Sequence, residues 1–377
     1  MLNKFSLAMA LLLGTMIGAG IFGIPYVVSR SGIILGFFYF LFLGIFVLLI
    51  HLFFGEIVLR TKEKQRLPGY AQKYLGKKGK ILAAFSTILG IILVLLAYII
   101  LGGDFLEILF RGSGLSSFQF SLIFALVLSP LIFKGIKLVA RAEFFTNLTF
   151  ILIIFLVFYL TFPKIDFQNF HLVDFKNIFL PYGVILFALT GWNAIPEMAE
   201  ILEERSEKKK FKKAIIFSVI LATFLYILFA LSVIGVSGKN TSADAFSGLL
   251  PHLSKNIILL GVLAGVITIA DSFLILGLYL KNSLIYDFNI KKNLSFLLAW
   301  GIPLILFLLG FRQFIGVIGL AGTIIGAIEG ILIILIFQKA KTLGNREPEY
   351  SLRVPTPFLY VLILVFILGG IFHFFLS

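Results

Sequence analysis

The chain has 377 residues, of which 60% are hydrophobic and only 13% are charged, and its mean hydropathy is +1.09. Soluble domains are about 45–50% apolar and about 25% charged, so this composition excludes an ordinary soluble protein. The absence of cysteine excludes disulfides, thiolate nucleophiles and cysteine metal sites. The net charge of +14 is carried by residues between apolar runs, which indicates membrane topology and argues against nucleic-acid binding.

Apolar runs recur along the whole chain, and most are long enough to cross a hydrocarbon core of about 30 Å. Together with the charged breaks between them, they predict eleven transmembrane helices. The predicted spans are 5–29, 31–59, 80–110, 118–133, 145–162, 178–201, 214–236, 257–288, 294–311, 314–337 and 356–376. We therefore expect an all-α, polytopic membrane protein.

The basic residues alternate between the two sides of these predicted helices. The N-terminus and every second loop together carry 25 of the 32 Lys and Arg residues. Cytoplasmic loops are richer in Lys and Arg, which places the N-terminus in the cytoplasm and, after eleven spans, the C-terminus outside. We expect a monomer in the cell (plasma or inner) membrane, whose partners are the lipid bilayer and a small-molecule substrate.

Two short segments of the first and sixth spans are alike. Gly20–Pro25 and Gly191–Pro196 both read Gly-x-x-small-Ile-Pro, and 171 residues separate them. The same offset carries the third span onto the eighth and the fifth onto the tenth. Five spans are an odd number, so two such repeats run in opposite directions across the membrane. We predict repeats over 5–162 and 178–337 and an extra helix at 356–376, within a single transmembrane domain. Inverted repeats with interrupted helices at matching positions point to a transporter's binding site.

The glycines of the first span predict that its helix is interrupted. An interruption at mid-membrane is tolerated only where protein or a polar cavity satisfies the freed backbone groups. Freed N–H groups near Ala19, Gly20 and Ile21 can hold a carboxylate, and freed carbonyls near Gly14 and Ile17 can hold a cation. Close helix packing through small residues is the alternative explanation for some of these glycines.

Four segments resemble a known group of transporters. The segment Gly14–Tyr26 resembles the first helix of the amino acid/auxin permease and aromatic amino acid permease families, and Leu67–Tyr70, Thr190–Glu197 and Asp271–Gly277 agree with it. These families belong to the amino acid–polyamine–organocation superfamily. The resemblance implies a LeuT-type five-plus-five inverted fold in which helices 1 and 6 are broken. It also implies a secondary active transporter that moves an amino acid by alternating access, coupled to H⁺ or Na⁺, with no cofactor.

In that fold the unwound parts of helices 1 and 6 hold the carboxylate and amino groups of the substrate. The matching substrate-binding candidates are Gly18, Ala19, Gly20, Ile21, Tyr98, Phe187, Thr190, Gly191, Trp192 and Asn193. Tyr98 can reach a substrate carboxylate, although simple packing explains it equally well, and Trp192 can close over the substrate. Ala19, Ile21 and Phe187 favour an apolar or aromatic substrate side chain.

Sodium-coupled members of that fold hold a sodium ion between helices 1 and 8. The matching cation or proton candidates are Gly14, Ile17, Thr268, Asp271 and Ser272. The family usually has a small or hydroxyl residue in place of Asp271, which argues against plain sodium coupling. A charge at the helix centre costs at least about 2.5–3.5 kcal/mol, so Asp271 needs a cation, a proton or a structural hydrogen bond.

Two glutamates are further candidates for gating or proton binding. Glu197 follows the sixth-span interruption, where it lines the inner pathway or caps freed N–H groups, and Glu329 lies within the tenth span. Glu56 is expected to pair with Arg60 four residues on, and His51 to be packed with one hydrogen bond.

Rival functions have less support in the sequence. It contains no HExxH, GxSxG or P-loop motif and no evident group of nucleophile, histidine and acid, so we do not expect an enzyme. A channel does not require two interrupted helices at inverted positions. A transporter-like amino acid sensor and a carrier of a different small solute stay open, since each would use the same pocket.

Overall fold

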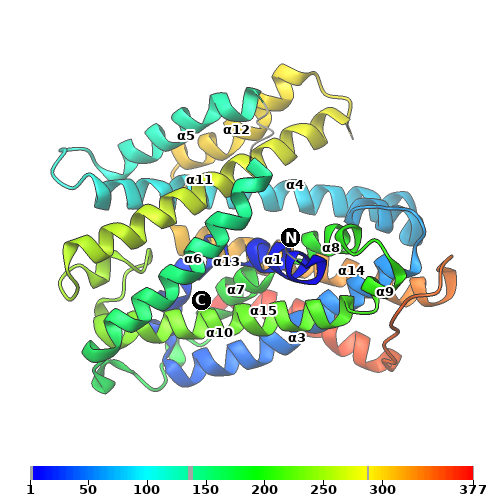
Figure 1. The fold of residues 1–377 in the computed structure, drawn as a ribbon, viewed down its shortest axis with the longest axis horizontal. Coiled ribbons are helices and arrows are strands. Elements are labelled where there is room, and N and C mark those ends of the chain that lie inside the picture. The colour runs from blue at the N-terminus through cyan, green and yellow to red at the C-terminus, as the bar shows by residue number, and fades with distance from the viewer. Residues whose placement is uncertain (1–2, 135–138, 287, 377) are drawn as a thin grey trace.

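The computed structural model describes residues 3–134, 139–286 and 288–376, and most of its helices run side by side along the long axis of the molecule (Figure 1). The first half of the chain forms α1 (Lys4–Met16), α2 (Gly20–Ser31), α3 (Ile33–Arg60), α4 (Leu67–Leu109), α5 (Ser117–Lys134), α6 (Val139–Thr161), η1 (Phe162–Lys164), η2 (Phe167–Asn169) and η3 (Phe175–Asn177). The second half forms α7 (Leu180–Leu189), η4 (Trp192–Ala194), α8 (Ile195–Ile201), α9 (Arg205–Lys208), α10 (Phe211–Ser237), η5 (Gly238–Asn240), η6 (Ser247–Leu249), α11 (Lys255–Tyr286), α12 (Lys292–Leu308), α13 (Phe314–Leu320), η7 (Ala321–Ile325), α14 (Gly326–Leu343) and α15 (Thr356–Leu376).

The predicted apolar spans fall on these helices. Within the described residues, six helical stretches are long and apolar enough to cross a membrane, and the bent pair α1–α2 adds a seventh. Three shorter apolar helices, in α5, α6 and α12, coincide with three more predicted spans, and α7 with α8 occupies the predicted span 178–201. The nearly all-helical membrane architecture is confirmed, whereas the number of eleven crossings stays a prediction.

The chain leaves helical geometry at the two places that share the Gly-x-x-small-Ile-Pro pattern. Helix α1 ends at Met16, α2 begins at Gly20, and the two are bent by 56°. In the second place α7 ends at Leu189, Thr190 is extended, and α8 begins only at Ile195, after the single turn η4. The interruptions at Ile17–Ala19 and Thr190–Gly191 are called the first-span break and the sixth-span break below.

The predicted loop 60–80 differs from the structure, because α4 already begins at Leu67. Pro68 lies in the first turn of α4, where its fixed φ suits a helix and its missing N–H costs no hydrogen bond. Gly76, with a φ of +77°, kinks the helix before it enters the apolar span. The charged composition of 60–80 concealed this helical segment, since a helix outside the membrane needs no apolar run.

The interrupted segments lie inside the bundle. Helix α2 packs against α7, α1 packs against α10 and α8, and α14 packs against α3 and α4. Phe22 of α2 is fully buried, with its ring 4.9 Å from that of Phe105 and 5.4 Å from that of Phe150. Large apolar side chains such as Leu41 of α3 and Phe375 of α15 are exposed on the outside. This distribution suits a bundle whose outer surface meets lipid.

Candidate functional site

The two interrupted helices meet at one tyrosine. The Tyr226 hydroxyl, on α10, lies 2.6 Å from the carbonyl oxygen of Met16 and 2.8 Å from that of Ala188. Met16 is the last residue of α1, and Ala188 lies one residue before the end of α7. Tyr226 is fully buried. A single phenol hydroxyl therefore serves two carbonyls at the ends of interrupted helices, where the helix itself supplies no partner.

Several substrate-binding candidates come together around the first-span break. A methyl group added at Gly18 would lie 3.1 Å from the Tyr98 hydroxyl oxygen. One added at Gly20 would lie 2.8 Å from the Cα of Ala188 and 3.1 Å from the ring of Phe187. The structure thus brings Gly18 next to Tyr98 and Gly20 next to Phe187, and only glycines fit at these two positions without displacing a neighbour.

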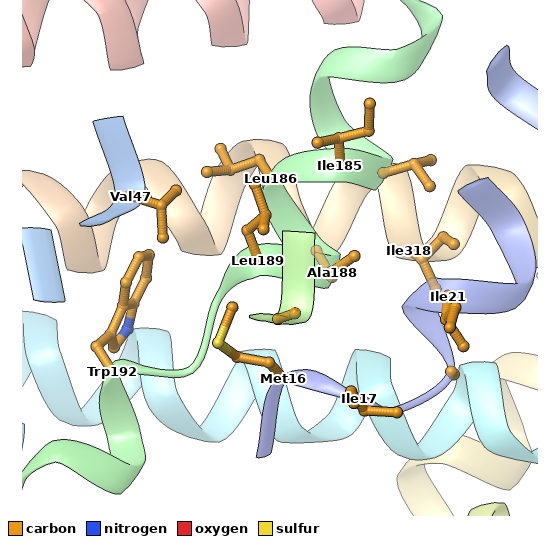
Figure 2. Packing of buried hydrophobic residues seen from close by; sticks show 14 of the residues in the cluster. Met16, Ile17, Ile21, Val47, Ile185, Leu186, Ala188, Leu189, Trp192 and Ile318 are labelled. Carbon is orange, nitrogen blue, oxygen red and sulfur yellow. The ribbon is translucent and has the colours of Figure 1, made fainter. Parts of the chain in front are cut away.

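The side chains at the centre of this group are closely packed. Ala19 and Ile21 are buried, at 1% and 0% exposure. Figure 2 shows Ile21 of α2 beside Ile318 of α13, with Met16 and Ile17 on the segment that leads into α2. Ala19 and Ile21 are therefore part of the packed core, whereas Gly18, Phe187 and Thr190 are only half-buried.

The candidates of the sixth-span break point in other directions. The Thr190 hydroxyl donates to the Leu186 carbonyl, at 2.8 Å, within its own segment. Trp192 is fully buried and lies beside Val47 of α3, on the other side of Met16 from Ile21 (Figure 2). Trp192 therefore does not cover Ala19–Ile21 here. Gly191 contacts Met16, whereas Asn193 is exposed.

A cavity of about 750 Å³ begins beside the breaks. Its walls are the apolar faces of α1, α4, α8 and α11, and Thr15 and Asn193 border it next to the two breaks. Its charged lining residues are Lys4, Arg66, Glu197, Glu200 and Glu203. A second cavity, of about 890 Å³, shares Arg66 and Thr87 with it. The cavity joins the interrupted helices to the end of the bundle that carries the basic loops.

Ion pairs cross the charged end of this cavity. Arg66 lies 3.0 Å from a carboxylate oxygen of Glu197 and 3.1 Å from one of Glu200. Lys4, at the start of α1, lies 3.2 Å from Glu207. These ion pairs connect α1 and α8 to neighbouring segments. Glu197 lines the cavity, which is one of the two roles that the sequence predicts for it.

The predicted cation set comes from two elements. Gly14 and Ile17 belong to the α1 end of the first-span break, whereas Thr268, Asp271 and Ser272 lie on α11. The main neighbours of α1 are α10 and α8, and those of α11 are α4 and α6. Asp271 is half-buried and its side chain has a partner. The described residues contain no group of three or more His, Asp or Glu side chains that could hold a metal ion.

Glu329 lies at the contact of three elements. It is 2% exposed. The indole N–H of Trp192 donates to its Oε2 at 2.7 Å, and the Thr87 hydroxyl donates to its Oε1 at 2.8 Å. Glu329 thereby joins α14 to the sixth-span break and to α4, just after the π-helical turn η7.

Sequence reasoning missed Tyr226 and Thr87, because each is a single polar residue within an apolar span. The contacts that give them a role join residues 210 and 242 positions apart in the chain. The expected pair of Glu56 and Arg60 is confirmed at 2.7 Å. His51 makes the expected single hydrogen bond, to the Val47 carbonyl at 2.8 Å, while its buried Nε2 has no hydrogen-bond partner within the described residues.

The apolar helices, the two breaks inside the bundle and the cavity that reaches them define a membrane transporter. The model of the tryptophan/tyrosine permease family matches residues 1–373, and the chain belongs to this family. The chain is therefore an amino acid transporter and not an enzyme. The families named from the first-span motif are not the one that matches, whereas the class of transporter is confirmed.

Individual proteins agree with this assignment. The chain is 27% identical, over 90% of its length and 89% of the relative's, to "Tyrosine-specific transport system 1" of Haemophilus influenzae. It is 22% identical, with the same coverage, to "Glutamine transporter 2" of Aliivibrio fischeri. The crystal structure of MhsT in complex with L-phenylalanine is similar with a TM-score of 0.64 and 14% identity, over 98% of this chain and 97% of that chain. This last likeness shows the LeuT-type fold.

Proposed function

We propose that the chain moves aromatic L-amino acids, tyrosine first among them, across the cell membrane by secondary active transport. Three observations support the substrate class: the family is described as tryptophan/tyrosine permeases, one relative is described as tyrosine-specific, and the solved structure of the same fold holds phenylalanine. The glutamine transporter among the relatives makes a polar amino acid the second candidate.

The observation that carries the transport mechanism is the meeting of two helix breaks at Tyr226. We infer that these breaks are the unwound parts of spans 1 and 6 in two inverted repeats, 5–162 and 178–337, of an eleven-span protein. Backbone groups of Gly18–Ile21, with Phe187, Thr190 and Gly191 opposite, would then bind the carboxylate and amino groups of the substrate. Gly20 against Phe187 supports this pairing, because it places the helix ends next to the two breaks in contact.

The position of the cavity supports an inward-facing conformation. It opens among Lys4, Arg66 and Glu203, next to the loops that carry most of the basic residues. With those loops in the cytoplasm, the N-terminus is cytoplasmic and the C-terminus is external.

The coupling ion is H⁺ or Na⁺. Gly14, Ile17, Thr268, Asp271 and Ser272 are the proposed positions of a cation shared by spans 1 and 8, and α1 and α11 both line the cavity of about 750 Å³. Replacing Asp271 by Asn should reduce uptake that is driven by an ion gradient. Unchanged uptake in that variant would remove Asp271 from the coupling site.

Gradient-driven uptake tests the proposed function. Purified protein in liposomes would be given labelled tyrosine, tryptophan, phenylalanine or glutamine, with a Na⁺ gradient and a pH gradient imposed separately. We expect uptake of aromatic amino acids with at least one of the two gradients. Uptake of glutamine alone would overturn the aromatic assignment.

A further inference from the structure

Glu329 is a carboxylate enclosed by neutral partners. Both of its oxygens accept hydrogen bonds, from the Trp192 indole at 2.7 Å and the Thr87 hydroxyl at 2.8 Å, and neither donor carries a charge. Within the described residues Glu329 forms no ion pair, and only 2% of it is exposed. An ionised carboxylate in such a place is costly. The protonated, neutral form of Glu329 avoids that cost, so this environment favours proton binding.

The hydrogen bonds of Glu329 fit both protonation states. An indole N–H only donates, whereas a threonine hydroxyl both donates and accepts. When Oε1 carries a proton, it can donate to Thr87 while Oε2 still accepts from Trp192. Proton binding therefore needs no rearrangement of heavy atoms, and it changes the charge on the acceptor of the Trp192 bond.

The two hydrogen-bond partners of Glu329 lie beside the inner cavity and beside the sixth-span break, the two places that a coupling site must connect. Thr87 lines both cavities and so links Glu329 to water at the basic end of the bundle. Trp192 is the first residue of η4 and directly follows the sixth-span break. A charge on Glu329 is thus one hydrogen bond from the inner cavity and one hydrogen bond from the break.

Several titratable side chains on the elements around Glu329 have other partners. They are His51 of α3, bonded to Val47; Glu56 of α3, bonded to Arg60 and Lys341; Tyr98 of α4, next to Gly18; Glu197 of α8, paired with Arg66; and His373 of α15, bonded to the Phe179 carbonyl. The His51 ring lies 5.9 Å from that of Trp192.

We propose that Glu329 binds and releases the proton that is coupled to amino acid transport, with Thr87 as its connection to the inner cavity and Trp192 as its connection to the sixth-span break. The proton comes from water on the outer side and leaves to water in the inner cavity, and no other group is consumed. The proposal rests on the proposed function; it names H⁺ as a coupling ion and adds Glu329 as a second coupling residue beside Asp271.

The fluorescence of Trp192 tests proton binding without any transport assay. The chain has two tryptophans, and Trp300→Phe leaves Trp192 as the only one. In reconstituted Trp300→Phe protein we expect the Trp192 emission to change with pH along a single titration, and Glu329→Gln in the same background to abolish it. The Gln variant separates Glu329 from His51. The same titration with and without the Glu329 substitution would overturn the proposal.

A second variant keeps this test decisive if Glu329→Gln does not fold. Thr87→Val removes one hydrogen-bond partner of Glu329 and leaves the carboxyl group in place. We expect it to shift the midpoint of the Trp192 titration without abolishing it. An unshifted midpoint would contradict the assignment to Glu329.

Uptake then tests the coupling itself. At one proton per substrate, a pH difference of about one unit supports at most about tenfold accumulation. We expect the ratio of uptake with and without that gradient to fall to one in Glu329→Gln and to recover partly in Glu329→Asp. A Glu329→Gln protein that keeps the wild-type ratio would overturn the proposal. Exchange of labelled for unlabelled amino acid by the wild-type protein reports on the proposed function separately.

Discussion

Tyr226 offers one hydroxyl proton to two carbonyl oxygens that belong to different interrupted helices. The Met16 carbonyl also accepts a hydrogen bond from the N–H of Gly18, at 2.9 Å, so the backbone of the first-span break supplies part of its own hydrogen bonding. The Ala188 carbonyl depends on Tyr226 for its side-chain hydrogen bond. At the scale of single residues, Tyr226 stabilises the arrangement of the two breaks that the proposed substrate site needs.

Replacing Tyr226 by Phe should destabilise the protein by about 1–3 kcal/mol, because the Ala188 carbonyl loses its side-chain donor and the Met16 carbonyl loses one of two donors while the ring is kept. The measurement is the thermal unfolding of the purified protein. Tyr159→Phe is the matched control, since Tyr159 is 74% exposed and should show no change. Equal stability of the Tyr226 variant and the wild type would show that the hydrogen bonds of Tyr226 do not stabilise the protein.

Replacing Gly20 by Ala should impair transport, because its methyl group would lie 2.8 Å from Ala188 at the contact of the two breaks. Overpacking of this kind costs about 1–3 kcal/mol. Gly301→Ala in α12 is the control, since the added methyl group meets nothing within 4 Å. We expect tyrosine uptake to fall in the first variant and to stay normal in the second. Normal uptake with Ala at position 20 would place the substrate elsewhere.

At the scale of elements, hydropathy predicts where helices lie because lipid requires apolar runs, and the glycine-rich motifs indicate where they are interrupted. The contacts between elements cannot be predicted from hydropathy or from these motifs. The contacts of Tyr226 with Met16 and of Glu329 with Thr87 depend on how distant spans pack. No local sequence pattern encodes this packing. The helix start at Leu67 was missed for the opposite reason, because a polar helix outside the membrane lacks the hydropathy signal.

A buried ionic cluster fixes α3 to α14 and to the segment before α15. Glu56 has no exposed side-chain surface and lies 2.7 Å from Arg60 and 2.6 Å from Lys341. One of its oxygens also accepts the backbone N–H of Leu352 at 2.7 Å. The spacing predicted the first of these contacts, whereas Lys341 and Leu352 lie far along the chain.

Replacing Glu56 by Ala should lower stability by about 1–3 kcal/mol, because it leaves two half-buried cations and the Leu352 N–H without their acceptor. The melting temperature of the purified protein measures this. Glu63→Ala, which removes the exposed partner of Lys73, should leave the melting temperature unchanged. If both variants melt alike, the buried cluster does not hold the helices together.

At the scale of the whole molecule, the cavity and most of the basic residues lie at the same end of the bundle. Helix α3 connects the two ends. The N–H of Ile33, at its start, bonds to the His171 carbonyl, and the carbonyl of Arg60, at its end, accepts from Asn345. The cavity and the basic loops are at the Arg60 end. Both features agree with the proposed inward-facing transporter, whose N-terminus we place in the cytoplasm.

Cysteine labelling tests this orientation, and the natural chain contains no cysteine that would interfere. Gln168→Cys lies in the segment that contains His171, and Gln72→Cys lies at the Arg60 end; both positions are exposed. A maleimide that cannot cross membranes should label the first in intact cells and the second only after permeabilisation. The reverse result would invert the topology.

The most direct test of the central claim, an amino acid carried through the site between the two breaks, is counterflow. Sealed liposomes that contain the purified protein and unlabelled tyrosine would be diluted into a trace of labelled tyrosine, without any ion gradient imposed. The account predicts transient accumulation of label above equilibrium that unlabelled phenylalanine or tryptophan competes away. No accumulation of labelled tyrosine, tryptophan, phenylalanine or glutamine in such liposomes would contradict it.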